Sequence, residues 1–162
     1  MTESTCFETV WPARAYQRTD PVNFRVDATM SEVVSECRGR LCYLATPYSK
    51  MVLDDAGRWS REKSITAAIL AGRWVRDFAL DGVTALSPIA LCCAALDADH
   101  VTGYLDPLDA VFWENWCRPM LNASGAVIVP PLPGWQESVG IGVEVRAALQ
   151  IGLPVYVMGP VE

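Results

Sequence analysis

From residue 41 onward, short apolar segments alternate with longer segments in which apolar residues recur at helical spacing. The apolar segments are RLCYLATPYS, VTALSP, GAVIVPP and LPVYVM. Between the first two lies REKSITAAILAGRWVRDFALDG, where Ile65, Ile69 and Val75 mark one face of a helix that ends at Gly82. Strands that alternate with helices in this way form parallel sheets with helices on both faces. The sequence therefore predicts a single α/β domain with a Rossmann-like, flavodoxin-like sheet.

Two more helices are expected in the second half of the chain. One runs from Pro107 to about Asn122, and the other begins at the capping residue Ser138 and continues to about Gln150. The segment LDADHVTGYLDP, which precedes the first of them, is rich in Asp and Gly. That composition is typical of a loop.

Residues 1–40 lack this alternation. Their polarity is mixed, and only DATMSEVVSECRGR is compatible with a short helix, which would begin near Asp27. We therefore expect residues 1–40 to be an N-terminal appendage or lid and residues 41–162 to be the domain. On this interpretation the domain should still fold when residues 1–38 are deleted.

Composition narrows the possible partners. The chain has 162 residues, 51% of them hydrophobic and 20% charged, which is enough for one core. A net charge of −6 argues against binding to a nucleic acid polymer, which requires clustered Lys and Arg. The longest apolar runs are too short or contain Pro, and no basic-then-apolar leader opens the sequence, so we expect a cytoplasmic protein without a membrane partner. Small molecules are the expected partners.

The cysteine pattern does not match a zinc site. Six cysteines show no CxxC spacing, and the chain has one histidine, His100. Buried, reduced thiols are the better interpretation. We expect no metal site and no cofactor.

Glu144 lies within the helix that starts at Ser138, on a side that is expected to face inward. At about 100° per residue, its neighbours on that face are small or apolar, namely Gly140, Ala147, Ala148 and Ile151. The opposite side, expected to face solvent, carries Gly142, Arg146 and Gln150. A buried carboxylate is costly and often marks a functional site. The alternatives are an ion pair with an arginine such as Arg118, or exposure if the helix is rotated.

Three segments follow directly on expected strands, and ligands of open parallel sheets bind at such positions. They are ATPYS, the pair Ser87 and Pro88, and PPLPGWQES. The last segment leads into the Ser138 helix, whose free amide groups and dipole favour an anion. We therefore expect a phosphate or carboxylate at Ser138.

Two of these segments resemble the nucleoside 2-deoxyribosyltransferase-like superfamily. YLATPYS, from Tyr43 to Ser49, matches a strand that ends in Y-x-A-x-P-Y, and PGWQESVGIGVEVRAALQIGLPVYV matches G-W-x-x-S-x-G-x-x-x-E followed by A-x-x-x-G-x-P-V. The resemblance covers residues 41–158. Its nearest branch is a group of small bacterial and phage domains.

The resemblance implies covalent catalysis by Glu144. The matching glutamate of relatives attacks the anomeric carbon of a nucleoside or nucleotide, expels the base and leaves a glycosyl-enzyme, which water or another base then opens. Tyr43 would orient this nucleophile by a hydrogen bond. Substrate-binding residues would be Ala45, Pro47, Tyr48, Ser87, Trp135, Ser138 and Gly140. Relatives complete their sites across subunits, which implies a homo-oligomer.

The sequence departs from that family at the acids that hold the departing base. Gly125 and Cys117 occupy positions where acidic residues are common, and Asp109 and Glu114 are possible substitutes. We assign the proton transfer to Asp109. Two alternatives stay open. One is a catalytically inactive nucleotide-binding or sensor domain. The other is a phosphoribohydrolase with a P-G-G-x-G-T-x-x-E loop, which fits less well because Trp135 and Gln136 interrupt the glycines.

Overall fold

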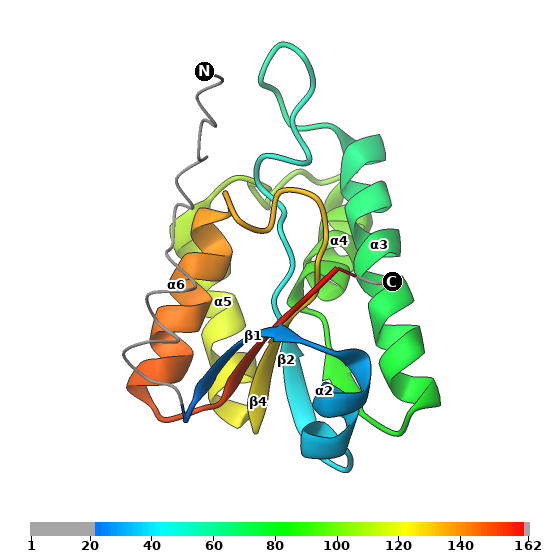
Figure 1. The fold of residues 1–162 in the computed structure, drawn as a ribbon. Helices are drawn as coiled ribbons and strands as arrows, with labels where there is room; N and C mark the ends of the chain where they lie inside the picture. The colour runs from blue at the N-terminus through cyan, green and yellow to red at the C-terminus, as the bar shows by residue number, and fades with distance from the viewer. Residues whose placement is uncertain (1–21, 161–162) are drawn as a thin grey trace, which may run out of the picture.

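A computed structural model describes residues 22–160 and shows a five-stranded parallel sheet flanked by helices (Figure 1). The strands are β1 (Phe24–Ala28), β2 (Leu41–Leu44), β3 (Thr84–Leu86), β4 (Ala126–Val129) and β5 (Val155–Met158). Their order in the sheet is β1-β5-β4-β2-β3. The predicted α/β architecture is confirmed.

Five helices connect the strands within the described residues. They are α2 (Met30–Cys37), α3 (Arg61–Leu80), α4 (Pro88–Asp99), α5 (Ala110–Ala123) and α6 (Val139–Gln150). Each begins after a polar residue whose side-chain oxygen accepts an N–H bond from the first turn, and these caps are Thr29, Ser60, Ser87, Asp109 and Ser138. Local capping thus fixes where every described helix starts.

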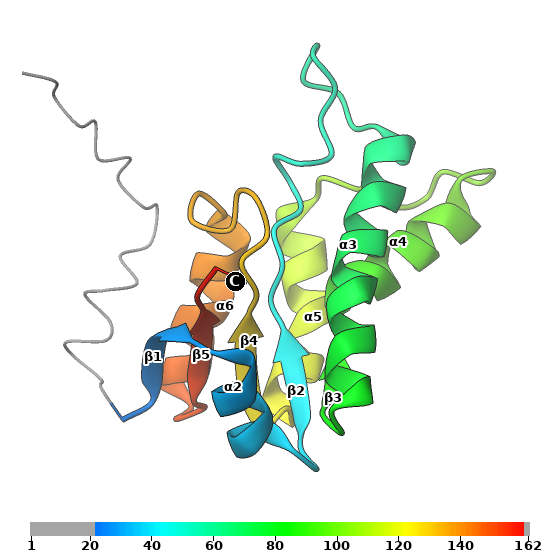
Figure 2. The ribbon, with the colours of Figure 1, turned by 45° about the vertical axis from the view of Figure 1, so that its right-hand side comes forward.

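The two faces of the sheet are buried by different helices (Figure 2). Successive residues of a strand point to opposite faces. Val127 and Val129 of β4 therefore pack with α5 and α6, whereas Ala126 and Ile128 pack with α2 and α3. Because all four side chains are buried, β4 is a central strand.

The strand order places a topological switch point between β2 and β4. If counting starts at β2, the first four strands follow the 2-1-3-4 order of a flavodoxin-like sheet, and β1 occupies the place of its fifth strand. From β2 the chain crosses to β3 on one side, then returns past β2 to β4 on the other. A crevice therefore forms where the carboxyl ends of β2 and β4 diverge.

The expectation of an appendage or lid over residues 1–40 is wrong for residues 24–37, and residues 1–21 lie outside the described part of the chain. β1 pairs with β5 along the edge of the sheet, and the Phe24 side chain is 0% exposed. Val33 and Cys37 of α2 are buried on the opposite face. A short helix near Asp27 is correct, because α2 begins after Thr29. Since these residues complete the core, deleting residues 1–38 should not leave a folded domain.

The helix α4 lies where the sequence predicts none. It covers PIALCCAALDAD, so the first residues of the expected loop, Leu96 to Asp99, are still helical. The helix predicted from Pro107 begins later, after the cap Asp109. In α6, Gly142 is buried rather than on the solvent side, whereas Arg146 and Gln150 are exposed as expected.

Five cysteines are free and buried, as predicted, and Cys6 lies outside the described residues; the five are Cys37, Cys42, Cys92, Cys93 and Cys117. Between residues 22 and 160, no helix is both long and apolar enough to span a membrane.

Candidate functional site

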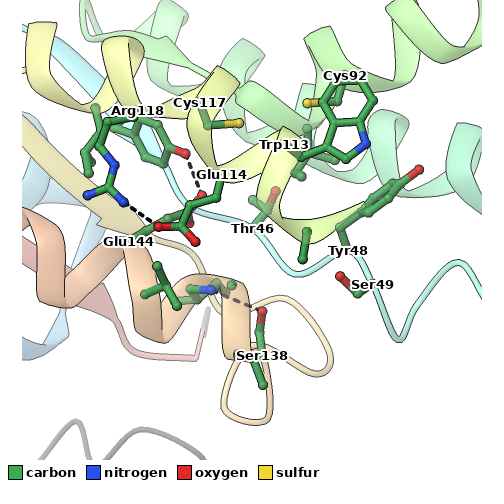
Figure 3. Close-up of a pocket in the computed structure, with 18 of the residues that line it drawn as sticks. Thr46, Tyr48, Ser49, Cys92, Trp113, Glu114, Cys117, Arg118, Ser138 and Glu144 are labelled. Carbon is green, nitrogen blue, oxygen red and sulfur yellow. Dashed lines mark hydrogen bonds and ion pairs between the residues drawn. The ribbon is translucent and has the colours of Figure 1, made fainter. Parts of the chain in front are cut away.

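A cavity of about 300 Å³ opens at the switch point, beyond the carboxyl ends of β2 and β4 (Figure 3). Its walls come from the segment after β2, from α4, from α5 with the loop before it, and from the first turns of α6. This is where ligands bind in open parallel sheets. The loop that follows β2 rises above this edge of the sheet (Figures 1 and 2).

Glu144 and Tyr43 form the hydrogen-bonded pair in the inner wall of the cavity. The Tyr43 hydroxyl donates to Oε1 of Glu144 at 2.5 Å, and the Tyr43 side chain is 0% exposed. Tyr43 lies in β2, so the rigid sheet fixes its ring, and Glu144 lies in the second turn of α6. The second carboxylate oxygen, Oε2, remains available to a ligand.

The environment of Glu144 favours its neutral form. The residue as a whole is half-buried, yet desolvation of its carboxyl group raises the pKa to about 8, and the charges of Cys117 and Glu114 act in the same direction. The Tyr43 hydrogen bond opposes this rise by stabilising the carboxylate. Burial and the nearby Glu144 charge also raise the pKa of Tyr43, which therefore remains a hydrogen-bond donor. Perturbed carboxylates of this kind are typical of functional sites.

An ion pair between Glu114 and Arg118 lies in the cavity wall beside Glu144 (Figure 3). The two residues are four apart in α5, so they lie on the same side of the helix. The alternative in which Arg118 neutralises Glu144 does not hold, because Arg118 pairs with Glu114. Arg118 therefore does not neutralise Glu144, and the charge of Glu114 instead helps to raise the pKa of the Glu144 carboxyl group.

The start of α6 forms another part of the wall. Ser138 caps the helix by accepting a bond from the Ile141 amide at 3.3 Å, and Ser138, Val139 and Gly140 all line the cavity. A Cβ atom at Gly140 would meet only the Ser138 hydroxyl, at 3.9 Å, so the space in front of this turn is open. An anion could approach the free amides here.

Two arginines that follow β2 along the chain are engaged in ion pairs of their own. Arg58 pairs with Asp54, and Arg61 pairs with Asp97. Of the described residues, Arg118 is the one Lys, Arg or His that lines the cavity. An anion at α6 would therefore depend mainly on backbone amides and the Ser138 hydroxyl.

The opposite end of the cavity is aromatic. Tyr48 and Trp113 lie there, away from Glu114, Arg118 and Glu144 (Figure 3). The Tyr48 hydroxyl accepts a bond from Trp59 at 3.0 Å and shares one with Ser64 at 2.9 Å, and the Trp113 ring N–H donates to a backbone carbonyl at 2.8 Å. Because these polar atoms are already bonded, both residues offer the cavity mainly their ring surfaces.

The structure brings half of the residues expected at the site to the cavity and leaves the rest outside it. Those that line it are Tyr43, Tyr48, Ser138, Gly140 and Glu144. The others do not line it, namely Ala45, Pro47, Ser87, Asp109 and Trp135.

Each residue outside the cavity has a different place in the fold. Asp109 caps α5 by accepting from the Phe112 amide at 3.0 Å, and Ser87 caps α4 in the same way at 3.2 Å. Trp135 packs against the core cluster that contains Ala45, and Pro47 is buried. The assignment of a catalytic proton transfer to Asp109 is therefore corrected, because its carboxylate is used in a helix cap.

The cavity is also lined by four residues that the sequence does not predict as site residues: Thr46, Trp113, Glu114 and Arg118. Glu114 was recognised only as a possible substitute for a missing acid. The segment ATPYS did point to the neighbourhood of Thr46, but the neighbours of that residue, Ala45 and Pro47, were chosen instead. The rotation of α5 about its axis decides which of its residues face the cavity. The segment ENWCR, residues 114–118, mixes polar and apolar side chains and does not indicate that rotation.

Comparison with known proteins identifies the family to which the chain belongs. The family described as "Domain of unknown function (DUF1937)" matches residues 40–160, a segment that contains the switch point and every residue that lines the cavity. No curated protein and no solved structure matches the chain. Since the matched segment covers most of its length, the chain belongs to the DUF1937 domain family.

Proposed function

We propose that this protein cleaves or transfers at the N-glycosidic bond of a nucleoside or nucleoside 5′-monophosphate, with Glu144 as the nucleophile. The observation that carries the proposal is the Glu144 carboxyl group in the cavity wall, with a strongly raised pKa and a 2.5 Å hydrogen bond from a buried tyrosine. The resemblance to nucleoside 2-deoxyribosyltransferases supports the same residue. A carboxylate is a competent nucleophile toward a sugar carbon with oxocarbenium character.

The reaction needs Glu144 to lose its proton and the departing base to gain one. With a pKa of about 8, Glu144 carries its proton at neutral pH. In our proposal Glu114, which lines the same cavity, relays that proton from Glu144 to the base, so the base gains the proton that the nucleophile loses. Oε2 then attacks the anomeric carbon, the electron pair of the C–N bond moves to the base, and Glu114 protonates the base. Water or a second base opens the glycosyl ester, which makes the overall reaction hydrolysis or base exchange.

The proton transfer can be tested with two acids, Glu114 within α5 and Asp109 at the N-terminal cap of that helix. We expect Glu114→Gln to lower kcat by about a hundredfold, since general acid–base groups typically contribute that much or more. Asp109→Asn is the matched control, because asparagine caps helices as well as aspartate and the residue lies outside the cavity. The measurement is chromatographic release of free base. A loss in the Asp109 variant with full activity in the Glu114 variant would reverse the assignment.

The start of α6 favours substrates that carry a 5′-phosphate. The helix end stabilises an anion by about 1–2 kcal/mol, and charge-assisted hydrogen bonds to Ser138 add to this. Glu137 and the net charge of −6 oppose the effect. We still expect kcat/KM for a 5′-monophosphate to exceed that for the nucleoside by about tenfold, and Ser138→Ala to reduce the preference.

The phosphate preference is measured by assaying the wild type and Ser138→Ala for base release from a panel of nucleosides and their 5′-monophosphates. Equal kcat/KM values for the two substrate types, or a preference that Ser138→Ala leaves unchanged, would exclude Ser138 as a phosphate contact. Tight binding without base release from any substrate would instead support a nucleotide-binding sensor domain.

A further inference from the structure

Thr46 has a buried hydroxyl group without a hydrogen bond. The residue lies two positions after the end of β2, is 6% exposed and lines the cavity. Among residues 22–160, its Oγ1 is the buried side-chain oxygen for which the structure provides no partner. Buried polar groups are almost always bonded, so an exception at a cavity wall indicates a partner that the free protein lacks.

The position of Thr46 in the cavity indicates which part of a bound ligand could contact its hydroxyl group. Thr46 lies between the charged end of the cavity, with Glu114, Arg118 and Glu144, and the aromatic end, with Tyr48 and Trp113 (Figure 3). A sugar attacked by Glu144 occupies the charged end. A base joined to that sugar extends past Thr46 toward the two rings.

The polar groups of the aromatic end are few. Ser49 lies there beside Tyr48 (Figure 3), and the cavity lining also includes the apolar residues Ile89, Leu96, Pro107 and Leu108. The Tyr48 hydroxyl and the Trp113 ring N–H are already bonded within the protein. Because Ser49 is exposed to solvent, Thr46 provides the buried neutral hydroxyl without a protein partner between the two ends.

We propose that Thr46 binds the base of the substrate through one hydrogen bond, and that the base is a neutral aromatic ring packed against Tyr48 and Trp113. This inference rests on the proposed function, because it takes Glu144 as the place of the sugar. A hydroxyl both donates and accepts, so Thr46 can bond a carbonyl or an amino group on the ring. The apolar walls exclude a charged base, because they leave its charge without a partner.

Two substitutions separate binding by Thr46 from a structural role. Thr46→Val keeps the shape and removes the hydroxyl, while Thr46→Ser keeps the hydroxyl. The hydroxyl has no partner within the protein, so its removal breaks no hydrogen bond of the fold and we expect Thr46→Val not to lower the melting temperature. A structural hydrogen bond would give the opposite result. A lower melting temperature for Thr46→Val than for Thr46→Ser would therefore overturn the proposal.

Ligand binding provides the second measurement, by calorimetry on the full-length chain carrying Glu144→Gln to prevent turnover. The probes are 2′-deoxyuridine 5′-monophosphate, 2′-deoxycytidine 5′-monophosphate and 2-deoxyribose 5-phosphate, which has no base. We expect Thr46→Val to weaken both nucleotides by about tenfold and to leave the sugar phosphate unchanged, since one hydrogen bond is lost. Thr46→Ser should restore the nucleotide affinity.

The outcomes distinguish this inference from the proposed function. Equal weakening of all three probes would place Thr46 against the sugar or phosphate, and no weakening of the nucleotides would remove it from the site. Either result overturns the inference while base release by the wild-type protein can persist. The expected binding pattern without any base release would support Thr46 as a base contact and reject the catalytic proposal.

Discussion

Replacing Glu144 with glutamine is expected to lower base release by about a thousandfold or more, because the amide is no nucleophile while its volume is nearly that of the carboxyl group. The glutamine oxygen can still accept the hydrogen bond that Tyr43 donates to Oε1 in the wild type. Substrate affinity should therefore change by less than about tenfold. Single-turnover assays of base release, together with calorimetric titration, measure the two quantities separately. Wild-type activity in this variant would exclude the covalent mechanism.

The stability of the same variant provides the control against misfolding. The pKa of Glu144 is raised to about 8 in the folded protein, so the folded state holds this proton more tightly than the unfolded chain does. The stability that this provides is complete below the ordinary glutamate pKa and is lost as pH rises to about 8. A neutral glutamine avoids the loss. We expect denaturant titrations to show the variant becoming more stable relative to the wild type between pH 5 and about 8.5.

The second large expected effect is a loss of stability when the core residue of β1 is truncated. Phe24→Ala is expected to lower the free energy of unfolding by about 3–5 kcal/mol, because it removes a fully buried aromatic side chain and leaves a cavity. Phe24 packs in the same core cluster as Tyr43, Val127 and Val145. The loss therefore affects the face of the sheet that supports the hydrogen-bonded pair of Tyr43 and Glu144.

Val22→Ala is a matched control, because Val22 lies two residues earlier and is 81% exposed. Exposed substitutions of this kind usually change stability by less than about 0.5 kcal/mol. Urea denaturation of the two variants and the wild type measures the difference. Similar midpoints for both variants would show that β1 contributes little to the core and would revive the idea of a separable N-terminal segment.

The sequence predicts most helices and strands of the domain, but it does not predict α4 or β1, for two different reasons. The helix α3 shows an apolar repeat because one of its sides faces solvent. By contrast, α4 contains the nearly continuous apolar run IALCCAAL, packs beside α3 and lines the cavity, so its sequence lacks a polar side that would reveal helical spacing. The strand β1 does alternate, as FRVDA, but five residues within a mixed segment gave too short a signal.

The sequence predicted the central pair of the site but not its surroundings. Glu144 and Tyr43 lie 101 positions apart, and two motifs placed Tyr43 in the first expected strand and Glu144 in the helix that starts at Ser138. Thr46 could not be selected in this way, because its hydroxyl differs from any other loop hydroxyl only by the bond it lacks. Asp109 and Glu114 are close in the sequence, yet Asp109 caps the start of α5 while Glu114, within the helix, lines the cavity.

The pairing of β1 with β5 has a consequence for synthesis on the ribosome. β1 is the first of the described strands to be translated, and β5, its only neighbour in the sheet, is the last. Until β5 emerges, Phe24 and the rest of β1 have no strand to pair with. The edge of β4 that will pair with β5 also has no neighbour. Contacts between such distant segments form slowly, since a long loop must close before they can contribute. The edge that completes the core of the mature protein is thus, in the nascent chain, its most aggregation-prone part.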